Sequence, residues 1–295
     1  MNETLMVARN NVIEIFKAGL GAVMPAGAIN LCCSLNDNIL EINGRGYDLD
    51  SYEKILVLGA GKGGASMAKA VEELLGDRIS EGLVIVKYGH LEQLRTVRIL
   101  EAAHPVPDEN GYRAARAMFD LASAADEKTL ILSLISGGGS ALMPYPVDGV
   151  SLGDKQETTR VLLACGANIH EINTIRKHLS VVKGGGLARA AYPATLVNLI
   201  LSDVIGDDLD TIASGPCVPD SRTFADCLEI FSRYRIGDKI PENVMSHILR
   251  GVEGEVRETP KPGDRIFERT ANVIIGGNFD ALLESKGKAE DLGYT

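Results

Sequence analysis

Short runs of aliphatic residues recur along this chain, and most of them end at a loop that contains glycine. Runs of about four to eight such residues, bounded by turn residues, are typical of buried strands. The predicted strands cover residues 54–58, 83–86, 95–100, 130–135, 196–201 and 272–275.

Apolar residues at helical spacing predict amphipathic helices between the strands. Ser151 is a favourable N-cap for one of them, with Asp154 three residues later, and Gly293 is placed to close the last one. Residues 19–50, which contain Gly, Pro and Asn, are expected to be irregular. The predicted helices cover residues 3–18, 65–75, 110–125, 151–164, 223–234, 241–250 and 279–292, with a further buried helical face within 170–191. The repeated order of strand, loop and helix predicts an α/β protein with a mostly parallel sheet.

Composition and charge narrow the function classes. A length of 295 residues suggests about two domains. The formal net charge of −10 argues against nucleic acid or an anionic membrane as the main partner, but a local pocket can still be positive. No segment has the ~18–20 uninterrupted apolar residues of a membrane span, and the first residues do not resemble a secretion signal. The cysteines form no CxxC pair, which favours a reduced, cytoplasmic setting.

The stretch from Thr129 to Pro144 places a Ser-Gly-Gly-Gly-Ser turn directly after an aliphatic run. Glycine allows positive φ and close approach, so successive backbone N–H groups can converge on an anion. A flexible surface turn is the alternative. The candidate ligand-binding residues of this turn are Ser136, Gly137, Gly138, Gly139 and Ser140.

A second glycine loop follows the strand at 54–58 and opens the helix at 65–75. Its residues Gly59, Gly61 and Gly64 match the GxGxxG dinucleotide fingerprint. The next strand ends at Lys87-Tyr88 rather than at the acidic residue that would hold the ribose of NAD, although NADP would tolerate a basic residue there. Lys62 lies at a helix N-terminus, where a cation is unfavourable unless an anion is also bound. We therefore interpret Lys62 as a phosphate-facing charge, flanked by Gly61 and Gly63, with a solvated loop lysine as the alternative.

Two later segments carry clustered charges. Arg176, Lys177 and Lys183 lie near Gly184–Gly186, which predicts an anion clamp, unless they form a solvated basic face. Asp203, Asp207 and Asp208 follow the strand at 196–201, and their oxygens suit Mg²⁺. Because ligands collect at the carboxyl ends of parallel strands, these loops are expected to share one site. His104 also ends a strand, and a structural role is the preferred interpretation for it.

Five segments taken together resemble the glycerate 2-kinase family of the MOFRL type. They are GAGKGGASMAKA, HPVPDENG, SGGGSALMPYP, INTIRKHLSVVKGGGLA and SDVIGDDLDTIASGPCVPD, in this order. The resemblance covers about residues 5–240 well and 270–295 more weakly. It implies a Rossmann-like three-layer N-terminal domain over residues 1–240. It also implies that residues 241–295 form a linker and the start of a smaller C-terminal α/β domain.

The resemblance implies transfer of the γ-phosphoryl group of ATP to the 2-hydroxyl of glycerate with Mg²⁺, with Lys62 as the catalytic lysine. Family members continue through a further segment that carries a functional arginine, so one wall of the cleft is expected to be absent from these residues. Two alternatives stay open, namely an NAD(P)-dependent hydroxypyruvate reductase and a non-catalytic nucleotide- or sugar-acid-binding module. A homodimer is compatible with these expectations.

Overall fold

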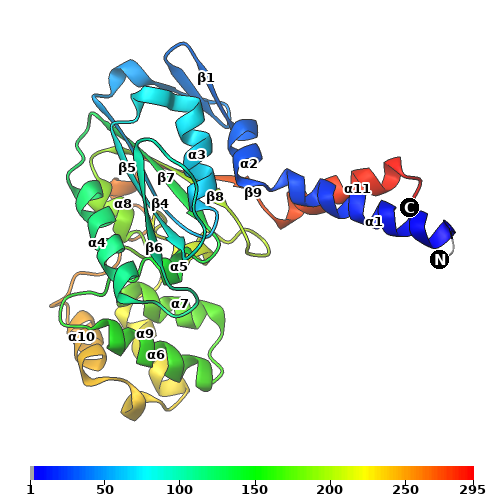
Figure 1. The fold of residues 1–295 in the computed structure, drawn as a ribbon. Helices are drawn as coiled ribbons and strands as arrows, with labels where there is room; N and C mark the ends of the chain where they lie inside the picture. The colour runs from blue at the N-terminus through cyan, green and yellow to red at the C-terminus, as the bar shows by residue number, and fades with distance from the viewer. Residues whose placement is uncertain (1–2) are drawn as a thin grey trace.

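The structure, a computed structural model that describes residues 3–295, is built on a six-stranded sheet (Figure 1). In spatial order the strands are β6 (Val97–Ala102), β5 (Glu81–Lys87), β4 (Lys54–Ala60), β7 (Thr129–Ser136), β8 (Thr195–Leu201) and β9 (Thr270–Gly276). Every neighbouring pair is parallel. The chain order therefore runs outward from β4 on one side and from β7 on the other, so the topological switch point lies between these two central strands. The predicted α/β class is confirmed.

Helices cover both faces of the sheet and give the expected three layers (Figure 1). On one face α2 (Pro25–Cys32) and α3 (Gly64–Leu75) pack against a core that includes Val57 and Leu132. On the other face α4 (Glu109–Ser123) and α8 (Gly186–Ala191) pack against a core that includes Leu58 and Ile131. Adjacent strand residues point to opposite faces. Because both faces are buried, the central strands are continuously aliphatic.

A helical lobe lies beyond the carboxyl ends of the strands (Figure 1). It consists of α6 (Leu152–Ala164), α7 (Ile169–His178), α9 (Phe224–Arg233) and α10 (Glu242–Val252), which share a separate apolar core. The predicted start of α6 is confirmed, because the Ser151 hydroxyl accepts a 3.0 Å hydrogen bond from the N–H of Asp154. The short helix α5 (Gly139–Leu142) joins the sheet to this lobe.

Two sequence predictions were wrong. Residues 19–50 are not irregular: they contain the end of α1, all of α2, and a hairpin sheet of β1 (Cys33–Asn36), β2 (Ile39–Ile42) and β3 (Arg45–Asp48). Asn43 and Gly44 both have positive φ, as the two-residue turn of a hairpin requires. The helical face predicted through Val182 ends at His178, because the chain turns there to bind the loop after β8. Gly184 and Gly185 donate backbone hydrogen bonds to Ser214 and Gly215.

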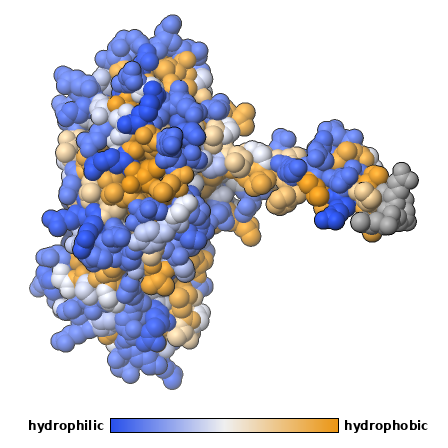
Figure 2. Space-filling model, in the orientation of Figure 1, coloured by the Kyte–Doolittle hydropathy of each residue, from blue (hydrophilic) through white to orange (hydrophobic). Residues whose placement is uncertain are grey.

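An arm of two helices projects from the body (Figure 1). It pairs α1 (Glu3–Ala22) with α11 (Asn278–Asp291), and apolar side chains such as Phe16 and Phe279 are exposed along it (Figure 2). Among residues 3–295, no single helix is long and apolar enough to cross a membrane, although α1 and α2 would qualify as a pair bent by 55°.

Residues 270–276, which the sequence assigns to the second domain, pair with β8 as the edge strand of the main sheet. The division at residue 240 stays a prediction. The remaining short elements are 3-10 turns at Leu49–Ser51, Gly76–Arg78, Ile212–Ser214, Gly237–Lys239 and Arg265–Phe267.

Candidate functional site

The loops that follow β4 and β7 interlock at the switch point of the sheet. The N–H of Lys62 donates to the carbonyl oxygen of Gly137 at 2.9 Å, and the N–H of Gly63 donates to the Ser136 hydroxyl at 3.0 Å. A Cβ atom on Gly61 would lie 2.1 Å from that same hydroxyl oxygen, so only glycine fits. The predicted residues Gly61, Gly63 and Ser136 therefore hold the two loops together.

The glycines of the 59–64 loop are used for packing within the protein. A Cβ atom on Gly59 would lie 2.4 Å from the carbonyl oxygen of Leu134 in β7, and Gly61 faces Ser136 of the same strand. Both positions need glycine because β7 is close, which accounts for the fingerprint without a dinucleotide. The absence of an acidic residue at the end of β5 points the same way.

Three side chains from different strand ends meet around Gly137 and Gly138. A Cβ atom on Gly138 would lie 3.2 Å from Cε of Lys62 and 3.0 Å from Cδ2 of His104. A Cβ atom on Gly137 would lie 2.2 Å from a carboxylate oxygen of Asp203. The loops after β4, β6 and β8 thus place a cation, an imidazole and a carboxylate around the loop after β7.

His104 is the residue of this group to which sequence reasoning gave a structural role. Burial and the charges of Lys62 and Lys87 lower the pKa of its imidazole, against an opposing effect of Asp203. The ring is therefore neutral at pH 7 and can accept a proton. Its position at the end of a strand was the available signal. Nothing in the sequence indicated that β6, two strands away from β4, would bring it to Lys62.

The loop after β7 presents a row of unused backbone donors. Within residues 3–295, the N–H groups of Gly137, Gly138, Gly139 and Ser140 have no hydrogen-bond partner. Gly138 has φ of +87°, a left-handed conformation that lets the chain turn sharply before α5. Consecutive free N–H groups in such a turn form a concave site for an anion. The anion-binding role expected for these residues stays a prediction.

A series of hydrogen bonds connects the 136–140 loop to the helical lobe. Ser140 and Ser214 share a hydrogen bond of 2.9 Å between their hydroxyls, and Ser214 donates to Oδ1 of Asn173 at 3.0 Å. The ammonium of Lys183 donates to the carbonyl oxygens of Ser140 at 2.7 Å and Met143 at 3.5 Å.

Buried cations gather beside this chain of hydrogen bonds. Lys183 is 2% exposed, and burial together with the charges of Lys155 and Arg176 lowers the pKa of its ammonium well below the usual value. Burial and the charge of Arg176 lower the pKa of Lys155 to about 7. Burial also lowers the pKa of Arg176. Sequence reasoning included Arg176 and Lys183 but missed Lys155, which lies in α6 and belongs to no glycine loop.

Lys177, the third predicted cation of the clamp, is already neutralised. Its buried ammonium is paired with the carboxylates of Asp210 and Asp220, the second at 3.4 Å. Its carbon chain packs against Gly184, where an added Cβ would lie 3.0 Å from Cβ of Lys177. The contacts of Lys177 therefore link α7 to the loops behind the site, and its predicted role in substrate binding has no contact that supports it.

The three predicted metal ligands point in different directions. Asp203 faces Gly137, whereas an added Cβ on Gly277 would lie 3.0 Å from Oδ1 of Asp207. Asp208 accepts hydrogen bonds from the Thr211 hydroxyl at 2.9 Å and from the N–H of Asp210 at 3.1 Å. Among residues 3–295, no three His, Cys, Asp or Glu side chains are gathered as a metal site. Of the three aspartates, Asp203 alone lies at the loop with the free N–H groups.

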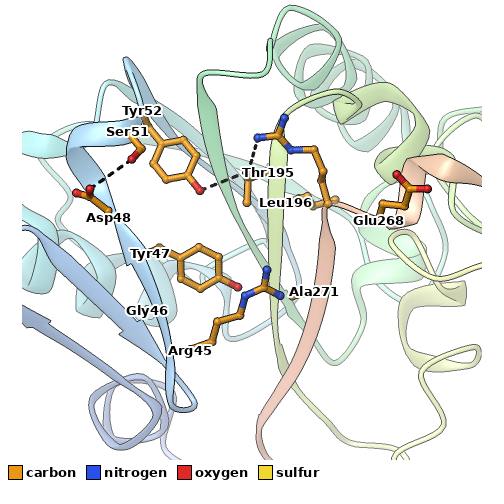
Figure 3. A pocket seen from close by; sticks show the side chains of 11 residues that line it. Arg45, Gly46, Tyr47, Asp48, Ser51, Tyr52, Thr195, Leu196, Glu268 and Ala271 are labelled. Carbon is orange, nitrogen blue, oxygen red and sulfur yellow. Dashed lines mark hydrogen bonds between the residues drawn. The ribbon is translucent and has the colours of Figure 1, made fainter.

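A separate pocket of about 300 Å³ lies at the other end of the sheet (Figure 3). It is lined by residues at the starts of β8 and β9 and by the hairpin strand β3. Arg269 and the hydroxyl of Tyr52 both donate to the Thr195 hydroxyl there, at 3.1 and 3.4 Å. Because the strands are parallel, this pocket is remote from the loops around Lys62.

A family described as a domain of unknown function, DUF4147, matches residues 11–249. The chain is 39% identical over 282 residues to the glycerate 2-kinase of Pyrococcus horikoshii, an alignment that covers 96% of this chain and 62% of that protein. It is 46% identical over 250 residues to an Agrobacterium vitis protein provisionally named a hydroxypyruvate reductase, covering 81% of this chain and 57% of the relative.

The fold of nearly the whole chain is similar to that of a solved structure. The crystal structure of a glycerate kinase from Thermotoga maritima superposes with a TM-score of 0.82 at 38% identity, covering 98% of this chain and 64% of that one. The chain thus spans less than two thirds of the length of each of these three relatives.

Proposed function

We propose a function from one premise: the chain belongs to the DUF4147 family, the MOFRL-type glycerate kinase family. The proposed reaction is transfer of the γ-phosphoryl group of ATP to the 2-hydroxyl of glycerate. The observation that carries the proposal is the meeting of Lys62, His104 and Asp203 around the free backbone N–H groups of the 137–140 loop.

Phosphoryl transfer depends mostly on positioning and on stabilisation of negative charge. The ammonium of Lys62 has no ion pair within residues 3–295, so it is available to the oxygens of the transferred group. The N–H groups of residues 137–140 supply further donors to the same oxygens. The neutral imidazole of His104 is available to take the proton of the attacking hydroxyl. The oxygen of that hydroxyl forms the new bond to phosphorus as the bond to the ADP oxygen breaks.

Mg²⁺ fits the proposal through Asp203. In nucleotide sites Mg²⁺ is usually bound by one or two carboxylates and by the substrate phosphates, so a cluster of three aspartates is not needed. Asp203 faces the same loop as Lys62 and would hold the ion, which when bound neutralises phosphate charge. Five free thiols support a reducing compartment such as the cytoplasm. A homodimer stays a prediction.

The test is ADP release with glycerate and Mg·ATP, measured on the chain and on Lys62→Met. We expect the variant to lose about 10²- to 10³-fold in kcat, the loss typical of removing one transition-state donor. Lys69→Met is the matched control, since Lys69 lies on the surface of α3 and pairs with the side chain of Glu92. Equal ADP release by the wild type and Lys62→Met would exclude the assigned role of Lys62.

The A. vitis relative suggests hydroxypyruvate reduction as the second candidate. The same preparation should therefore be assayed for NADH and NADPH oxidation with hydroxypyruvate. Rapid oxidation without ADP release would replace the kinase proposal. Because β7 fills the space beside Gly59 and Gly61, we expect no such oxidation.

A further inference from the structure

Three cations, Lys155, Arg176 and Lys183, lie together next to the proposed phosphoryl-transfer site, and among residues 3–295 no carboxylate forms an ion pair with any of them. We propose that Lys155, Arg176 and Lys183 form a subsite that binds an oxyanion, either a carboxylate or a phosphate, of the molecules that react beside Lys62. This inference rests on the proposed function for the identity of those molecules. It adds Lys155, a residue of the helical lobe, to the binding machinery.

The side chains in this cluster lack the partners that buried charges require. Lys155 is 9% exposed, and within residues 3–295 its ammonium nitrogen has no hydrogen-bond partner. Among the described residues, Lys183 donates only to the carbonyl oxygens of Ser140 and Met143. Arg176 forms no ion pair with any residue the structure describes. An unpaired buried charge is strongly unfavourable. An anion that binds in this cluster would therefore pair with cations that have already lost their contact with water.

Lys177 provides an internal comparison. It lies one residue from Arg176 in the same helix and is only 1% exposed, yet two carboxylates neutralise it. A buried lysine with a structural role thus has carboxylate partners within the protein. No residue of the described chain supplies such a counter-charge to Lys155 or Lys183, which indicates that a bound anion supplies it.

The cluster is tied to the transfer site through the 136–140 loop. Lys183 binds the carbonyl oxygen of Ser140, and Gly138, beside Lys62 and His104, is two residues earlier. Two residues of backbone span at most about 7 Å. A small hydroxy acid or the phosphates of a nucleotide can therefore contact both groups of residues at once. Arg176 is only partly buried, which leaves one side of the cluster open to solvent.

The residue types indicate an oxyanion. A guanidinium presents parallel N–H donors to two oxygens of a carboxylate or phosphate, and ammonium groups add point charges. Two molecules of the proposed reaction carry such groups, namely glycerate through its carboxylate and ATP through its phosphates. The structure identifies the shared chemistry, and binding measurements distinguish the two sources.

The experiment is calorimetric titration of the chain with D-glycerate and, separately, with a non-hydrolysable ATP analogue and Mg²⁺. Lys155→Met keeps nearly the same side-chain volume and removes the charge, and Arg176→Gln removes the charged guanidinium. We expect each to weaken binding of one of the two molecules by at least tenfold and to leave the other unchanged, which names the source. Lys239→Met, an exposed lysine of the same lobe, is the control and should bind both as the wild type does.

Two further readouts separate binding from a structural role. Lys155→Met should keep or raise the melting temperature, because it removes an unpaired buried cation. Burial and the charge of Arg176 lower the pKa of Lys155. Lys183 is a second nearby cation, and no carboxylate of the residues that the structure describes opposes these effects. Above pH 7 the free chain therefore has an uncharged Lys155, and binding of an oxyanion should take up a proton. The affinity should fall as the pH rises from 7 to 9, and Lys155→Met should reduce the proton uptake.

The proposal is overturned if both variants bind both molecules within twofold of the wild type. It is also overturned if the wild-type chain binds neither of them at millimolar concentrations. A lower melting temperature of Lys155→Met with unchanged proton uptake would assign the lysine a structural role instead. Failure of the kinase proposal looks different, since the wild-type chain would then release no ADP with glycerate and Mg·ATP while the subsite still binds its anion.

Discussion

The backbone N–H of Lys62 donates a 2.9 Å hydrogen bond to the carbonyl oxygen of Gly137, and this contact joins the loops that follow the two central strands. It fixes the start of the lysine side chain next to the row of free N–H groups at residues 137–140. The ammonium of Lys62 and the N–H groups of residues 137–140 can therefore bind the same ligand. The arrangement depends on the backbone, so substitutions of the glycines should disturb it as strongly as substitutions of the charged residues.

Gly138→Ala should reduce activity far more than its cost in stability suggests. An alanine at φ of +87° costs about 1–2 kcal/mol, and its methyl group would meet His104 and Lys62. Gly149→Ala is the matched control, because Gly149 has φ of +80° and open space around its Cα. Urea denaturation should show a similar loss of unfolding free energy in both variants. ADP release should fall by tenfold or more only in Gly138→Ala, since displaced catalytic groups can cost about 10²-fold. Equal activities of the two variants would contradict this.

Asp203→Asn should raise the Mg²⁺ concentration that activity requires, whereas Asp207→Asn should not. Asp203 faces Gly137 at the site, whereas Asp207 of the same loop lies against Gly277. We expect the Mg²⁺ concentration for half-maximal ADP release to rise by at least about tenfold in Asp203→Asn, the loss typical even of outer-shell changes. Asp207→Asn should match the wild type. A larger effect of Asp207→Asn would move the metal site away from Lys62.

Lys177→Met should destabilise the chain without a direct effect on ligand binding. The variant leaves Asp220, which is fully buried, without its cation. Breaking a buried pair by removing one partner costs about 3–5 kcal/mol. Chemical denaturation measures this loss, and Lys177→Met combined with Asp220→Asn should recover part of it. If Lys177→Met unfolds like the wild type but loses affinity for glycerate, the lysine is a ligand-binding residue.

The carboxylate of Glu258 should stabilise the fold at neutral pH, and this stabilisation should be lost as the pH falls. Burial alone raises the pKa of its carboxyl group. Hydrogen bonds from His178, Lys261 and the N–H of Phe224 outweigh burial and hold the pKa at about 2. A carboxyl group with a lowered pKa stabilises the fold above its unfolded pKa, and this contribution disappears as the pH falls toward the folded pKa.

The measurement for Glu258 is the unfolding free energy of the wild type and of Glu258→Gln between pH 7 and pH 3. The difference between them should be largest at pH 7 and should shrink steadily below pH 4.5. A difference that stays constant over this range would show that the charge of Glu258 is not what stabilises the contact.

Much of the fold follows from local patterns. The six strands lie within about two residues of the predicted aliphatic runs, because a strand buried on both faces must be continuously apolar. Ser151 and Asp154 cap α6 as expected, since a capping box involves only residues three apart. The hairpin at Cys33–Asp48 was missed although Asn43-Gly44 is its turn signal, because the short strands around it carry polar residues.

The site was predictable only in part. The glycine loops and Lys62 could be predicted, because a loop directly after a buried strand in a parallel sheet must lie at its carboxyl edge. The sequence by itself could not determine which loops meet there, since that depends on the spatial order of strands. Only the order β6-β5-β4-β7-β8-β9 brings His104 and Asp203 to Lys62 and turns Asp207 and Asp208 away. In the same way, packing of the helical lobe pairs Lys177 with two carboxylates and leaves Lys155 without one. Strand and helix periods are local properties of the chain, whereas the neighbours of a charged side chain are decided by tertiary contacts between distant segments.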